Sequence, residues 1–113
     1  MKAKYIPERG DIVWIDFNPT RGHEQAHKRP ALVLSLKLYN EKRGLILACP
    51  VTSKTKNYPF EVEVKAGKVR GVILADQIRT LDWQVRRVAF IERVDSVALA
   101  RVRETIIRLL TEE

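Results

Sequence analysis

The chain of 113 residues is poor in the residue types that build disulfide frameworks and metal sites. Its one cysteine, Cys49, excludes an intramolecular disulfide and is typical of a reducing compartment. Because its neighbours are apolar, we expect Cys49 to be buried rather than to act as a nucleophile. The two histidines, His23 and His27, stand without a cysteine pair or a carboxylate cluster at ligand spacing. We therefore expect no metal and no cofactor.

Long apolar runs are also missing. No run approaches the roughly 20 residues that a membrane span needs, and the N-terminal residues lack the apolar segment of a signal peptide. Repeats and low-complexity tracts are absent from the sequence. An apolar content of 45% suffices for one core, and 113 residues leave no room for a second. We expect one domain over residues 1–113, located in the cytoplasm.

Acidic side chains are fewer than basic ones, 14 against 21, which gives a formal net charge of +7. The first 56 residues hold 11 basic and 5 acidic side chains, whereas the remaining residues hold 10 and 9. An excess of this size favours a polyanionic partner, either nucleic acid or an acidic polypeptide. The alternative is a basic protein whose charged surface is only solvated.

The apolar pattern predicts a mainly β fold that ends in one helix. Phe60–Val64 alternates, with Phe60, Val62 and Val64 inward. From Ser96 to Leu110 apolar residues recur at helical spacing, and Asp95 or Ser96 can cap this helix. The expected strands are Asp11–Phe17, Ala31–Leu36, Leu45–Val51, Phe60–Val64, Val69–Ala75 and Val85–Glu92, with a short helical turn at Leu38–Lys42. Together they describe a small barrel or strongly curved sheet with a packed C-terminal helix.

The polar segment Phe17–Arg29 predicts a functional loop between two strands. Loops beyond about 12 residues without structure of their own are usually functional or disordered. Tight flanking by apolar segments argues against disorder here. Pro30 favours an extended backbone at Arg29, which directs the guanidinium.

A second polar loop, Thr52–Tyr58, complements the first. Pro50 cannot donate to a sheet ladder, so it predicts a strand end or edge from which Thr52 and Ser53 emerge. Arginine, glutamate, threonine and lysine side chains together suit a phosphodiester. RNA cleavage by its own 2′-hydroxyl needs a proton acceptor, stabilisation of an anionic phosphorus centre and a proton donor for the 5′-oxygen, without a metal.

Three blocks in this order resemble the MazF/PemK family of toxins from type II toxin–antitoxin pairs: RGDIVWIDFNPTRGHEQAHKRPALVLS, ACPVTSKTKNYPFEV and GVILADQIRTLDW. The resemblance implies a small SH3-like barrel of the MazF/CcdB type that forms a homodimer. It also implies a metal-independent, sequence-specific endoribonuclease (an mRNA interferase). Such an enzyme cuts single-stranded RNA to leave a 2′,3′-cyclic phosphate and a 5′-hydroxyl. The implied partner is a cognate antitoxin whose extended acidic tail occupies the RNA groove.

By the same resemblance, the catalytic residues are Arg29, Thr52 and Glu24. A guanidinium with a pKa above 12 is a poor proton acceptor, so Arg29 is expected to stabilise the charge on phosphorus. Glu24 either accepts the proton or only orients Arg29, and Thr52 donates a hydrogen bond to a phosphate oxygen. The expected RNA-contacting residues are Asn18, Lys28, Ser53, Lys54, Lys56, Gln77 and Arg79.

Several alternatives stay open. Trp14 and Trp83 either stack on RNA bases or pack in the core or an interface. One rival function is a toxin of the same barrel that poisons DNA gyrase through C-terminal residues including a tryptophan, whereas here those residues are Leu110–Glu113. Another is a nucleic-acid-binding regulator without catalysis, which explains the charge but not a glutamate within the long loop.

Overall fold

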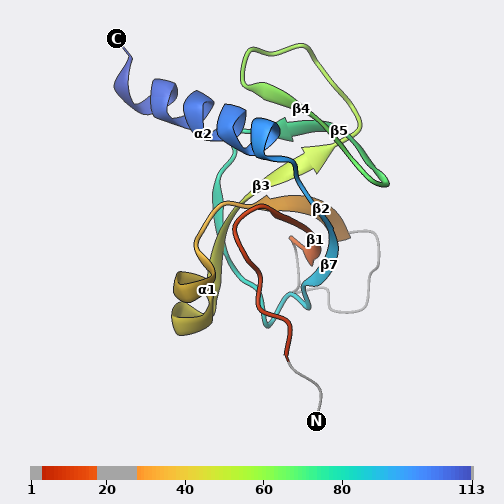
Figure 1. Ribbon diagram of the computed structural model, residues 1–113, viewed down its shortest axis with the longest axis vertical. Coiled ribbons are helices and arrows are strands. Elements are labelled where there is room, and N and C mark those ends of the chain that lie inside the picture. Colours follow the sequence, from red (N-terminus) through yellow and green to blue (C-terminus); the bar gives the residue numbers. More distant parts are fainter. Residues whose placement is uncertain (1–3, 18–27, 113) are drawn as a thin grey trace.

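The computed structural model describes residues 4–17 and 28–112 and shows a curled, seven-stranded antiparallel sheet with a long helix packed at one end (Figure 1). The strand order is β4-β5-β3-β2-β1-β7, and β6 also pairs with β3. The elements are β1 (Asp11–Asp16), β2 (Lys28–Val33), α1 (Lys37–Arg43), β3 (Leu45–Thr52), β4 (Glu61–Ala66), β5 (Val69–Leu74), β6 (Arg79–Asp82), β7 (Ala89–Arg93) and α2 (Ser96–Thr111). The expected mainly β fold with a C-terminal helix is confirmed.

Strand β3 is the branch point of the sheet. One of its edges pairs with β2, while the other pairs with β6 as far as Ala48 and with β5 from Val51. Pro50 lies between these two stretches and is buried. The expectation that Pro50 marks a strand end or edge is therefore wrong. Because proline has no N–H to pair, it fits the point where β3 changes partners.

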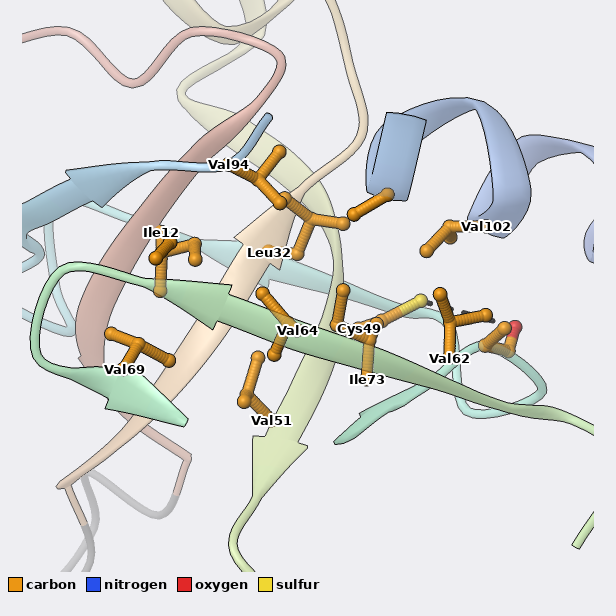
Figure 2. Packing of buried hydrophobic residues seen from close by; sticks show 13 residues of the cluster. Ile12, Leu32, Cys49, Val51, Val62, Val64, Val69, Ile73, Val94 and Val102 are labelled. Carbon is orange, nitrogen blue, oxygen red and sulfur yellow. Dashed lines mark hydrogen bonds between the residues drawn. The ribbon is translucent and has the colours of Figure 1, made fainter. Parts of the chain in front are cut away.

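Two apolar clusters occupy the two faces of the central strands. Along β1, Ile12 belongs to the cluster beneath α2 and the β4–β5 hairpin, whereas Val13 and Ile15 belong to the other. Figure 2 shows Val102 of α2 close to Cys49 and Val62 in the first cluster. Burial on both faces explains why the central strands are almost continuously apolar.

Cys49 is fully buried in the first cluster, as expected. Burial raises the pKa of its thiol to about 12, since a thiolate would lose its hydration there. The side chain therefore behaves as a small apolar residue at neutral pH.

Three parts of the chain depart from the expected strands. Arg79–Asp82 forms β6, which was not expected, and pairs with Leu45–Ala48 of β3. The strand expected at Val85–Glu92 begins only at Ala89 and ends at Arg93. Turns occupy most of the preceding residues, and Arg87 has a φ of 50°. Phe60 was expected inward but precedes β4 and is 37% exposed.

The ends of the long helix agree with the pattern. Asp95 occupies the N-cap position of α2, although its side chain makes no capping hydrogen bond.

Among the described residues, no helix combines the length and apolar character needed to cross a membrane.

A buried polar network attaches α1 to the sheet. The Asn40 side-chain amide donates to the carbonyl oxygens of Pro7 and Ser35, at 2.8 and 3.1 Å, and its own oxygen accepts from the Ser35 hydroxyl. The indole N–H of Trp83 donates to the Asn40 carbonyl at 2.9 Å. Trp83 is only 3% exposed, so its place is in the core.

Candidate functional site

Arg29 and Thr52 line one hollow of about 530 Å³ on the surface of the sheet. Arg29 comes from β2, and Thr52 is the last residue of β3. Ser53, the next residue, lines it as well. The other lining residues are Trp14, Pro30, Val51, Lys68, Val69, Arg70, Phe90 and Ile91. The fold thus brings together three of the predicted site residues, Arg29, Thr52 and Ser53.

Arg29 lies within a strand, not on the loop where it was expected. The β1–β2 pairing extends as far as Asp16 opposite Lys28, and Arg29 lies opposite Ile15. On its other side β2 pairs with β3 only from Ala31 onward. Pro30 is tolerated because it precedes the part of β2 that pairs with both β1 and β3. The Arg29 side chain is exposed on a backbone that the sheet holds in place.

The hydroxyl of Thr52 has one hydrogen-bonding role already filled. Its oxygen accepts a hydrogen bond from the backbone N–H of Lys54 at 3.1 Å. A hydroxyl can also donate one hydrogen bond, and this contact leaves that capacity unused. Thr52 can therefore donate to an oxygen of a ligand in the hollow.

The backbone around Thr52 depends on a glycine in the neighbouring strand. Gly71 of β5 has a φ of +151°, and a Cβ atom there would lie 2.2 Å from the Thr52 carbonyl oxygen. Residues other than glycine rarely adopt this φ, and the space beside the Thr52 carbonyl oxygen leaves no room for a side chain. Gly71 therefore allows β5 to lie directly against the end of β3.

The loop that follows Thr52 is anchored by Glu61 at the start of β4. The Glu61 carboxylate accepts hydrogen bonds from the Thr55 hydroxyl at 2.7 Å and from the backbone N–H groups of Lys56 and Asn57. These hydrogen bonds lower the pKa of the Glu61 carboxyl, and the bond from the Thr55 hydroxyl has the largest effect. A lowered pKa means that the anchor is intact at neutral pH and is lost only as acid protonates the carboxylate.

None of the other predicted site residues that the structure describes lines this hollow. Lys54 and Lys56 are exposed on the β3–β4 loop, and neither lines the hollow. Gln77, which precedes β6, and Arg79, its first residue, are both exposed. The Arg79 guanidinium lies 5.3 Å from the centre of the Phe17 ring. Lys28 pairs with Asp16 in the β1–β2 register. Asn18 and Glu24 lie outside the described residues.

Eight of the residues that line the hollow were not in the predicted site, and four of these eight are aromatic or basic. Trp14, which the sequence left open between stacking and packing, is 43% exposed here, and Phe90 is 48% exposed. Lys68 and Arg70 lie on the turn side of the β4–β5 hairpin. The local concentration of basic residues in the segment KAGKVR could have predicted Lys68 and Arg70. It was missed because basic and acidic residues nearly balance over the second half of the chain as a whole.

No predicted site residue lines a further hollow of about 340 Å³, which lies between the C-terminal part of α2 and Phe60. Within residues 4–17 and 28–112, no group of three histidine, cysteine, aspartate or glutamate side chains could hold a metal ion. We therefore place the candidate site at Arg29 and Thr52.

Comparison with known proteins decides the family. Residues 8–110 match the model of the PemK-like, MazF-like toxins of type II toxin–antitoxin systems. The chain belongs to this family. It is 48% identical over 86 residues to the endoribonuclease toxin MazF of Escherichia coli strain K12, covering 76% of this chain and 78% of that protein. It is 36% identical over 108 residues to the endoribonuclease toxin ChpB of the same strain, covering 90% of each.

Solved structures agree with this assignment. A crystal structure of MazE–MazF from Deinococcus radiodurans superposes with a TM-score of 0.85 at 43% sequence identity, covering 97% of this chain and 100% of that one. The predicted family and the SH3-like barrel fold class are therefore confirmed. The chain is a MazF-type toxin, and its relatives are named endoribonucleases.

We expect Gly71→Ala to lower the free energy of unfolding by at least about 2 kcal/mol, because the new methyl group meets the Thr52 backbone in a strained conformation. Gly44→Ala is the matched control, since Gly44 also has a positive φ of 68° but has no neighbour within 4 Å of the added atom. It should cost only about 1 kcal/mol. Urea denaturation of both variants measures the difference, and equal losses would show that the Thr52 contact is unimportant.

Proposed function

We propose that this MazF-type toxin is a metal-independent, sequence-specific endoribonuclease that cleaves single-stranded RNA to leave a 2′,3′-cyclic phosphate and a 5′-hydroxyl. The observation that carries the proposal is that Arg29 and Thr52, from two neighbouring strands, line the same hollow. In this proposal residues 1–113 act as one toxin domain in the cytoplasm.

The residues of the hollow match what the reaction needs. The 2′-oxygen loses its proton to a base and attacks phosphorus. The bond from phosphorus to the 5′-oxygen then breaks, and the 5′-oxygen takes up a proton. The fixed positive charge of Arg29 stabilises the extra negative charge on the phosphorus oxygens, and Thr52 donates a hydrogen bond to one of them. Glu24 is the candidate for accepting the proton or for orienting Arg29.

The exposed aromatic side chains fit a single-stranded substrate. Trp14 and Phe90 line the same hollow as Arg29, and each side chain is nearly half exposed. Unpaired bases commonly stack on such rings, while duplex bases cannot reach them. This arrangement favours RNA over a purely protein target such as gyrase.

We further propose a cognate acidic antitoxin and a homodimer as the partners of the chain. The similar structures from Deinococcus radiodurans include MazE–MazF complexes. An acidic segment would pair with the basic side chains of the hollow. A second copy of the chain would cover part of its exposed apolar surface, which includes Leu36, Leu38, Val85, Val97, Ile107 and Leu110.

The first test is incubation of the purified protein with a long RNA in the presence of EDTA. We expect cuts at one short sequence, and end analysis should find cyclic phosphates and 5′-hydroxyls. A requirement for magnesium, or 5′-phosphate ends, would contradict the proposed mechanism. Intact RNA would favour the gyrase-poisoning or the non-catalytic alternative.

Replacing Arg29 by alanine should lower the cleavage rate at least about 100-fold, as the loss of a preorganised charge-stabilising donor does in other enzymes. Thr52→Ala should lower it less. Stability should change little, since the Arg29 side chain is exposed. Arg103→Ala, at an exposed position of α2, is the matched control. If folded Arg29→Ala protein kept full activity, Arg29 would have no role in cleavage.

The partner proposal is tested by titrating the antitoxin's acidic C-terminal peptide into the cleavage reaction at two salt concentrations. We expect inhibition that competes with RNA and weakens at higher salt, because exposed charges are screened over about 8 Å at physiological ionic strength. Light scattering on the same protein should give twice the chain mass of 13.1 kDa. Inhibition without competition would place the peptide elsewhere, and a monomer mass would exclude the homodimer.

A further inference from the structure

The β4–β5 hairpin places positive charges against one another at its turn. Lys65 and Arg70 lie directly opposite each other in the register, and Lys68 follows the turn at Gly67. Like charges in directly opposed positions destabilise a strand pair. Within the described part of the chain, no ion pair joins any of the three cations to a carboxylate. A local conflict of this kind is typical of a site that serves a ligand.

These cations extend the candidate site beyond its hollow. Lys68 and Arg70 line the same hollow as Arg29 and Thr52. Arg70 and Lys65 line a neighbouring hollow of about 750 Å³, and Ser53 and Arg70 belong to both. A polyanion seated on Arg29 can therefore continue along the hairpin past the other cations.

The acidic groups nearby leave the turn end of the hairpin positive. Glu61 and Glu63 line the second hollow, but the Glu61 carboxylate is already held by Thr55 and two backbone N–H groups. Glu63 lies nearer the start of β4 than Lys65 does. The Glu92 carboxylate approaches Gly67 at the turn without pairing with Lys68. Phosphates are thus favoured beside Lys65 and Arg70 rather than beside the glutamates.

We propose that Lys65, Lys68 and Arg70 form a phosphate-binding arm that holds the RNA strand adjacent to the bond being cleaved. The arm rests on the proposed endoribonuclease function and adds a binding surface to it. Cations in succession along a hairpin suit the repeated charge of a nucleic-acid backbone. Continuity with a hollow that is lined by two exposed aromatic side chains favours RNA over an acidic polypeptide as the ligand.

The experiment compares two double variants that lose the same charges. Lys65→Gln/Arg70→Gln removes two of the three cations of the arm. Lys42→Gln/Arg43→Gln removes an exposed lysine and arginine from α1, which lies away from the hairpin in Figure 1. With an RNA oligonucleotide that contains the mapped cleavage site, the hairpin variant should raise KM on the order of tenfold at low salt and leave kcat within about twofold. The slope of log KM against log salt should fall by about 1.4, since each lost single-strand phosphate contact contributes about 0.7. The α1 variant should change neither quantity.

Several outcomes would overturn the arm. These are an unchanged KM in the hairpin variant, an equal rise in the α1 variant, and a fall in kcat alone. Weaker inhibition by the antitoxin with unchanged RNA binding would assign the surface to the protein partner instead. If the wild-type protein cleaves no RNA, the proposed function fails. Fluorescence anisotropy of labelled RNA with each double variant in the Arg29→Ala background then decides separately whether the hairpin binds RNA.

Discussion

The close backbone contact between β5 and the end of β3 is the constraint on which the shape of this molecule depends. Strand β3 is shared between two partners along one edge, with β6 beside its first half and β5 beside its last two residues. The sheet curls there, so that β4 and β5 cover one face of the central strands together with α2. Gly71 makes the contact possible because it brings no side chain between the two backbones. The same contact determines where Thr52 lies relative to Arg29.

The site is therefore built on strands, with loops only at its margins. Arg29 is held by pairing with β1, and the segment after Thr52 is held by the Glu61 carboxylate. Electrostatic stabilisation of a transient charge is strongest when the donors are already in position, because no reorganisation is then needed during the reaction. Sheet geometry provides that rigidity at both central residues. The hollow is open to solvent, as the proposed binding of a flexible RNA strand requires.

Much of this arrangement could be predicted from the sequence. Alternating or continuous apolar runs located most strands and the long helix, and the polar segments after them located Arg29, Thr52 and Ser53. Strand β6 was missed because Arg79–Asp82 is short and mostly polar, and pairing with β3 rather than its own pattern makes it a strand. Arg29 was expected on a loop because its polar neighbours concealed the β1–β2 ladder. The contribution of the hairpin depends on a register that connects Lys65 to Arg70, which composition alone does not reveal.

The two tryptophans occupy contrasting surroundings, and this gives the protein two separate internal probes. Trp83 is enclosed by the core and bonded to the Asn40 carbonyl, whereas Trp14 is nearly half exposed beside Arg29. A small quencher such as acrylamide should reach the indole of Trp14 and not that of Trp83 while the chain is folded. Quenching of the Trp14 fluorescence thus reports on whether the hollow is filled. Protection of the Trp83 fluorescence from the quencher reports on whether the chain is folded. Ligand occupancy and unfolding can be followed in one sample without any attached label.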